Sequence, residues 1–190
     1  MPAPLLETMS IYRPEKELGN IKPWLAAMIL SLRAYQAAGM TPEYGVENQI
    51  KQARKPTQSI HGLESIKDSL RALSGLSLPL QYELLDQTIK DLKRYKPTDF
   101  YQRWRSGNQN TMLIELQRLQ KIHPEAYQTV IVKRNQAWMK VIQKAIEPAN
   151  APKNAAPNQN IMVVVGALHL FGEVGLLPQL LKMGWTAQRL

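Results

Sequence analysis

The residues of this 190-residue chain that are best placed to do chemistry are His169 and Glu173. They follow a short apolar run, Ile161 to Val165, and the glycine Gly166. A short apolar run bounded by glycine is typical of a buried strand in an α/β protein. Such folds bind ligands beyond the carboxyl ends of their strands. We therefore expect either a functional imidazole and carboxylate at a strand end, or a tight strand-to-helix turn with a buried histidine.

Arg134 is the second unusual residue, because it lies in the middle of an apolar stripe on a helix predicted from Pro124 to about Ile146. At 100° per residue, the stripe consists of Val130, Ala137, Val141 and Ala145. A guanidinium that faces a core needs an anionic partner, since burying the charge alone is very costly. Glu64 and Glu173 are the predicted partners because both follow predicted strands. The alternative is that Arg134 only extends past the rim of the core.

The composition excludes several classes of protein. The chain is 44% apolar, carries a net charge of +9 and has no cysteine, so it can build a core but no disulfide or thiolate metal site. No run of about 18 uncharged apolar residues is present, so we expect no membrane span. The positive charge is typical of proteins that bind nucleic acid or anionic membranes, but it is spread in short clusters with few stacking residues. We therefore do not expect nucleic-acid binding.

The elements that would position these residues are mostly helices. Helices are predicted over about 21–39, 46–53, 65–73, 79–95, 98–105, 112–119, 124–146 and 175–184. Strands are predicted at 55–64, 161–165 and 185–190. Residues 1–19 are predicted to be an irregular lead-in to a domain spanning 20–190, and the proline- and asparagine-rich residues 147–160 a flexible linker loop within that domain.

Several segments also match one protein family in the family's order. They are Lys22-Pro-Trp-Leu25, Tyr44-Gly-Val-Glu47, Gly62-Leu-Glu64, Tyr101-Gln-Arg-Trp-Arg-Ser-Gly107, Lys133-Arg-Asn-Gln-Ala-Trp138 and Val165-Gly-Ala-Leu-His-Leu-Phe-Gly-Glu-Val-Gly-Leu-Leu177. The last two are the most specific. On these motifs the chain resembles the TraB/GumN family, which includes the Tiki proteases of animals and bacterial pheromone-shutdown proteins, over roughly residues 20–190.

The resemblance implies a helix-rich α/β fold of the EreA/ChaN type, with a small sheet and a helical middle region. It also implies a metal-dependent, peptidase-like hydrolase that acts on a peptide or protein. Carried over residue by residue, the implied catalytic residues are Glu64, Arg134, His169 and Glu173. Of these, His169 and Glu64 are the implied ligands of a divalent metal ion, which needs about three protein ligands.

One departure from the family pattern is important. The family has a first Gly-x-x-His motif, usually Gly-Thr-x-His, but no histidine stands three residues after Gly19, Gly39 or Gly45. We therefore expect the chain to be the C-terminal two-thirds of a family member, without its N-terminal strands. An exposed sheet edge would then pair with a second copy or with the missing segment. Two functions stay open: a hydrolase scaffold that is inactive because it is incomplete, and a non-catalytic peptide-binding or regulatory module.

Overall fold

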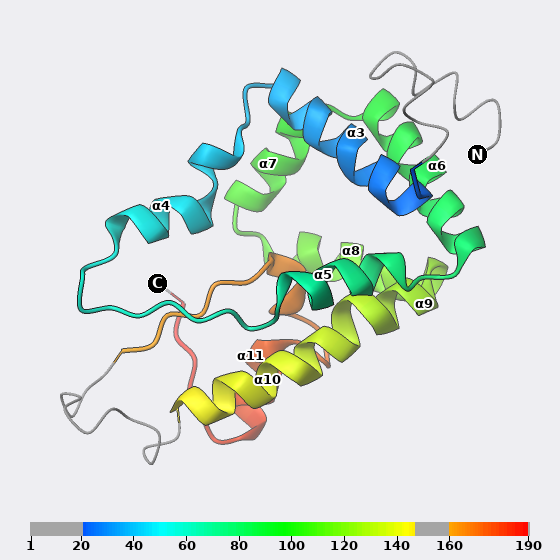
Figure 1. The fold of residues 1–190 in the computed structure, drawn as a ribbon. Helices are drawn as coiled ribbons and strands as arrows, with labels where there is room; N and C mark the ends of the chain where they lie inside the picture. Colours follow the sequence, from blue (N-terminus) through cyan, green and yellow to red (C-terminus); the bar gives the residue numbers. More distant parts are fainter. Residues whose placement is uncertain (1–20, 147–159, 190) are drawn as a thin grey trace. The chain divides into compact units, whose positions relative to one another are not determined.

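A computed structural model describes residues 21–146 and 160–189 (Figure 1). The helices of these residues are α3 (Pro23–Ala37), η1 (Pro42–Tyr44), α4 (Val46–Ala53), α5 (Ile66–Ser74), α6 (Leu78–Arg94), α7 (Pro97–Arg105), α8 (Gln109–Ile122), α9 (Pro124–Ala126), η2 (Tyr127–Val132), α10 (Lys133–Ile146), η4 (Ala167–His169) and α11 (Leu176–Lys182). The predicted lead-in and nearly all of the predicted linker loop lie outside the described residues. No described helix is long and apolar enough to cross a bilayer.

The prediction of an α/β fold with a small sheet is wrong for the part of the chain that the structure describes. None of the segments 55–64, 161–165 and 185–189 is a strand. A strand exists through backbone hydrogen bonds to a neighbouring strand, and residues 161–165 form none with any other described segment. The first three side chains of the run are exposed, Met162 by 73%, and only Val165 packs against a buried cluster. An apolar run of the right length does not become a strand without a partner.

The helix ends agree better with the sequence, because local chemistry determines them. Gly39 and Gly184 follow α3 and α11 with φ angles of 79° and 89°, a backbone region that glycine adopts without a steric penalty. Ser65 caps α5, since its Oγ accepts a hydrogen bond from the backbone N–H of Asp68 at 3.1 Å. The predicted helices over 79–95 and 98–105 are α6 and α7.

The long helix from Pro124 is continuous but not uniform, because η2 is a π-helix. A π-turn holds one residue more than an α-turn, so the buried face beyond it moves on by one position. The predicted stripe positions Ala137 and Val141 are exposed, and the buried residues are their neighbours Trp138 and Ile142. The stripe predicted for this helix is therefore wrong by one residue, and Arg134 lies at the edge of the buried face.

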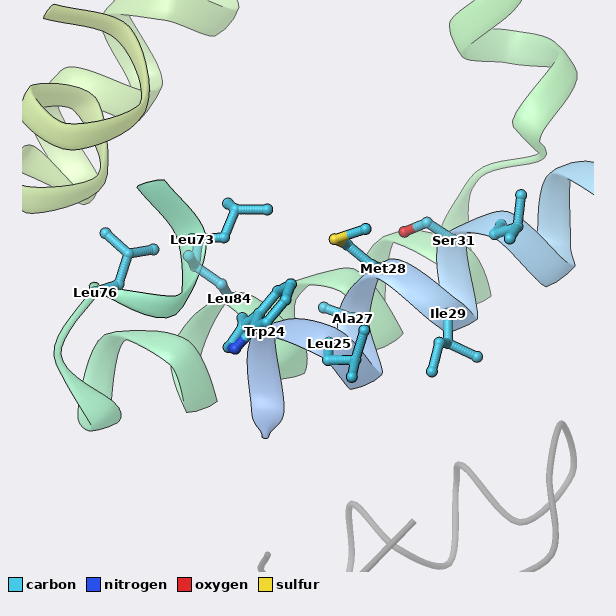
Figure 2. Close-up of a pocket in the computed structure, with 10 residues that line it drawn as sticks. Trp24, Leu25, Ala27, Met28, Ile29, Ser31, Leu73, Leu76 and Leu84 are labelled. Atoms are coloured by element: carbon cyan, nitrogen blue, oxygen red, sulfur yellow. The ribbon is translucent and has the colours of Figure 1, made fainter. Parts of the chain in front are cut away.

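The chain divides into two compact units. In the unit made of residues up to 59 and 71–108, α3 packs along α6. The core of this pair is Ala26, Leu30, Leu85 and Ile89. Beside α3 lies an open cavity of about 600 Å³ whose walls include Trp24, Met28, Leu73 and Leu84 (Figure 2). Its lining is almost wholly apolar, so this cavity does not offer groups for catalysis.

The second unit contains residues 60–70 and those from 109 onward, and it holds all of the predicted site residues. One of its clusters packs α8 against η2, through Leu116, Tyr127, Ile131 and Val132. The other packs α10 against α11, through Trp138, Met139, Ile142 and Leu176. The continuous helix of η2 and α10 therefore connects the two clusters, and α10 carries Arg134, Asn135 and Trp138 of the site.

Two glycines, Gly166 before η4 and Gly175 before α11, allow a prediction about the turn between these helices. A Cβ on Gly175 would lie 2.5 Å from the carbonyl oxygens of Leu170 and Phe171, which a backbone cannot accommodate. A Cβ on Gly166 would meet only His169 Cδ2, at an ordinary 3.6 Å. We expect Gly175→Ala to lower the free energy of unfolding by about 2 kcal/mol or more, and Gly166→Ala to change it by less than about 1 kcal/mol.

Urea unfolding of the two variants measures this difference. Equal losses of stability in both variants would show that the turn is not built as described.

Candidate functional site

The centre of the candidate site is an ion pair between Glu64, just before α5, and Arg134 on α10. Arg134 Nη2 donates to Glu64 Oε1 at 2.7 Å, and Arg134 Nε donates to Glu64 Oε2 at 3.2 Å. The two side chains are only 22% and 18% exposed. Bidentate pairing of this kind is the strongest geometry available to arginine and a carboxylate. The predicted pairing of Glu64 with Arg134 is therefore confirmed.

Trp138 lies one helical turn beyond Arg134 and covers the ion pair. Its indole Nε1 donates to Glu64 Oε2 at 3.0 Å. Its ring lies 4.6 Å from the Arg134 guanidinium carbon, in cation–π contact. The same ring packs against the His169 imidazole, with 4.4 Å between the centroids. One buried indole thus contacts Glu64, Arg134 and His169.

Asn135 holds His169 in a single orientation. The fully buried Asn135 amide donates from Nδ2 to the carbonyl oxygens of His169 and Val174, at 3.2 and 2.8 Å. Its Oδ1 is thereby directed at His169 Nδ1, 2.7 Å away. Since Oδ1 can only accept, Nδ1 must carry the proton. The lone pair of His169 Nε2 then faces Arg134 Nη1 at 3.4 Å.

The charges in the cluster shift the pKa values of both titratable groups. Burial and the Arg134 charge lower the pKa of His169 to about 4, against a weaker opposing effect of Glu64. Burial acts to raise the pKa of Glu64, but the hydrogen bonds and charge of Arg134 outweigh it, and the pKa lies below its usual range. At neutral pH the cluster therefore contains a neutral imidazole beside a complete ion pair.

The structure does not bring the fourth predicted residue into the cluster. Glu173 is exposed, and no hydrogen bond or ion pair joins it to the described Glu64, Arg134 or His169. Its charge instead acts with burial to raise the pKa of Tyr127. Glu173 as a partner of Arg134 is therefore wrong, because the turn between η4 and α11 directs its side chain to solvent. The catalytic roles of all four residues stay predictions.

The sequence reasoning missed Asn135 and Trp138 as site residues. Both stand in the Lys133 to Trp138 motif, so they were recognised as part of a pattern but not as functional groups. Counting an unbroken α-helix placed Asn135 off the buried face. Asn135 is the polar residue that points into the core. The π-helical turn η2 changes which face of α10 is buried, so the sequence pattern alone did not indicate this burial.

The residues implied as metal ligands do not form a complete metal site. The lone pair of His169 Nε2 is of the type that binds a metal, although Arg134 Nη1 already lies 3.4 Å from it. A ligating histidine usually donates its other N–H, as His169 does to Asn135. However, Arg134 and Trp138 already occupy both oxygens of Glu64. Within the described ranges, no three histidine, cysteine or acidic side chains gather to hold a metal ion. Of the two implied ligands, only His169 Nε2 remains as a possible metal ligand, and the Arg134 guanidinium lies beside it.

Comparison with known proteins confirms the family that the sequence motifs suggested. The model of the TraB/PrgY/gumN family matches residues 5–189. The chain belongs to this family. Glu64, Arg134 and His169 lie within the matched range, and membership does not by itself show an activity.

Two relatives from bacteria are similar to the chain. They are the uncharacterized protein YbaP of Escherichia coli (strain K12) and its counterpart in Shigella flexneri. Each is 28% identical over 163 residues, which cover 84% of this chain and 56% of the relative. The chain therefore spans little more than half the length of these relatives. No solved structure matches the chain.

The described cluster predicts the protonation state of His169. The native pKa of about 4 lies below the ordinary 6.5, so the unfolded chain takes up a proton more readily than the native one. The stability that His169 contributes is therefore full above pH 6.5 and is lost as the pH falls toward 4. The loss amounts to at most about 3 kcal/mol.

Histidine ¹⁵N NMR spectra measure this directly. We expect His169 to show the Nδ1–H tautomer and to stay neutral at pH 5. A His169 that titrates near pH 6.5, or that carries its proton on Nε2, would contradict the hydrogen bond from His169 Nδ1–H to Asn135 Oδ1.

Proposed function

We propose that this TraB/PrgY/gumN protein is a hydrolase scaffold of the peptidase type. His169 and Arg134 would be its contribution to substrate binding. The observation that carries the proposal is the pair of atoms His169 Nε2 and Arg134 Nη1, an acceptor and a donor 3.4 Å apart. A water molecule beside this pair could donate to Nε2 and accept from Nη1, and a peptide carbonyl oxygen could accept from Nη1. An arginine beside the reacting carbonyl also suits a negative charge that develops on its oxygen.

His169 is better suited to accept or to ligate than to act as a general base. A base works best when its pKa lies near the working pH, and the pKa of His169 is about 4. The low value keeps Nε2 unprotonated over the whole neutral range, which is what a ligand or an acceptor requires. The group that activates water would then be a residue other than His169.

A divalent metal ion, which the family resemblance implies, remains a proposal of the same kind. The described donor set is incomplete for it, so the steps assigned to this chain are binding and orientation only. Peptides or proteins are the proposed substrates, on family resemblance.

A second candidate function is a non-catalytic peptide- or protein-binding module on the same scaffold. One observation favours it. Both oxygens of Glu64 and the Nε and Nη2 atoms of Arg134 are satisfied within the chain, which is typical of a structural ion pair. A module of this kind would need the cluster for stability and not for chemistry.

Zinc binding observed at individual histidines separates the two functions. We expect added Zn²⁺ to shift the His169 ¹⁵Nε2 resonance selectively. Retention after dialysis should be below about 0.1 equivalent, since one or two ligands do not hold zinc. Without a complete ligand set, fluorogenic peptides should not be cleaved measurably. His169→Ala should abolish the response, and His61→Ala, which changes an exposed histidine, should not.

Two other results would change the conclusion. One equivalent of zinc retained by the chain and lost in His169→Ala would show a complete metal site with ligands outside the described residues, and would support the hydrolase. A response of His61 or His123 without one of His169 would contradict the hydrolase proposal and favour the binding module.

A further inference from the structure

Helix α7 is exposed on nearly all sides, although it carries three large aromatic residues. Phe100, Tyr101 and Trp104 are 45%, 40% and 43% exposed. No residue of α7 is buried, and no other described helix of its unit shares an extensive interface with it. Singly exposed aromatic residues are common, but three on one short helix form a patch that needs an explanation.

The aromatic residues occupy one side of α7. At 100° per residue, Phe100, Trp104 and Tyr101 fall within an arc of roughly 100°. The rings of Tyr101 and Trp104 lie against each other, with 6.0 Å between their centroids. Arg103 and Arg105 flank the arc on its two sides. The helix therefore presents a narrow aromatic face between two cationic edges.

The charges around this face are almost all positive. Residues 93–105 contain five cations, Lys93, Arg94, Lys96, Arg103 and Arg105, against the single carboxylate of Asp99. That carboxylate is turned to the start of the helix, where it accepts the backbone N–H of Lys96 at 3.0 Å. Arg94 and Arg103 both lie over the ring of Tyr95, at 5.2 and 5.9 Å. The surface thus alternates cations with aromatic rings.

We propose that this aromatic–cationic face of α7 binds the surface of an anionic lipid bilayer. Tryptophan and tyrosine prefer the membrane–water interface, and a helix with aromatic residues between arginines is suited to lie in the headgroup region. The charge complementarity is direct, since each arginine can contact lipid phosphates. The face is that of a single helix and not a groove, and two of its three rings, Tyr101 and Trp104, contact each other in a tilted arrangement. This argues against single-stranded nucleic acid, which follows a cationic groove and stacks its bases on free rings.

Sedimentation of the whole chain with vesicles tests this proposal. We expect binding to phosphatidylcholine vesicles that contain about one-third phosphatidylglycerol, none to pure phosphatidylcholine, and release by roughly 0.5 M salt. Phe100→Ala with Trp104→Ala should weaken binding about tenfold or more, because it removes the inserted rings. Arg103→Gln with Arg105→Gln should weaken it by about tenfold as well.

Matched variants separate this face from the general positive charge of the chain. Lys51→Gln with Lys55→Gln makes the same change in net charge at exposed positions outside α7, and Tyr44→Ala removes another exposed ring. Both should bind like the wild type within about twofold. An equal loss in the lysine variant would overturn the proposal in favour of non-specific attraction. Absence of vesicle binding, with or without binding to single-stranded RNA, would also overturn it.

Discussion

The ion pair between Glu64 and Arg134 is the interaction on which the rest of the site depends. It joins two residues that are 70 positions apart in the sequence and attaches the extended segment before α5 to α10. That segment forms no sheet with another described segment. Side-chain hydrogen bonds to Glu64 therefore hold it in place, as backbone hydrogen bonds between strands would in an α/β protein. Trp138 packs against the pair and adds a third hydrogen bond to the carboxylate. This partial burial makes the attraction stronger than at an open surface.

The buried Asn135 amide joins the ion pair's helix, α10, to the C-terminal residues His169 and Val174. Its hydrogen bonds attach α10 to the turn that follows η4 and fix the tautomer of His169. The π-helical segment η2 is what directs Asn135 and Trp138 into the core together, because it rotates the buried face of α10 by one position. Helix geometry, a buried amide and an ion pair therefore combine to fix the His169 imidazole with its unprotonated Nε2 facing Arg134.

The sequence predicted what local chemistry determines. Glycines at positive φ mark the ends of α3 and α11, and a charged residue near an apolar face required a carboxylate, which is Glu64. Strands could not be predicted in the same way, because a strand depends on a partner elsewhere in space. The run from Ile161 to Val165 has the composition of a strand but no partner among the described residues. The π-helix η2 displaces the buried face of α10, and no residue pattern in the sequence predicts a π-helix there.

A double-mutant cycle between Glu64 and Arg134 measures how strongly this ion pair stabilises the site. Glu64→Gln, Arg134→Met and the double variant are compared by urea unfolding. We expect a coupling free energy of about 1–3 kcal/mol at pH 7. The same cycle on the exposed pair Asp86 and Lys90, whose side chains are 44% and 66% exposed, should give a value near zero. A coupling between Glu64 and Arg134 as small as that of the exposed pair would show that the site does not depend on this ion pair.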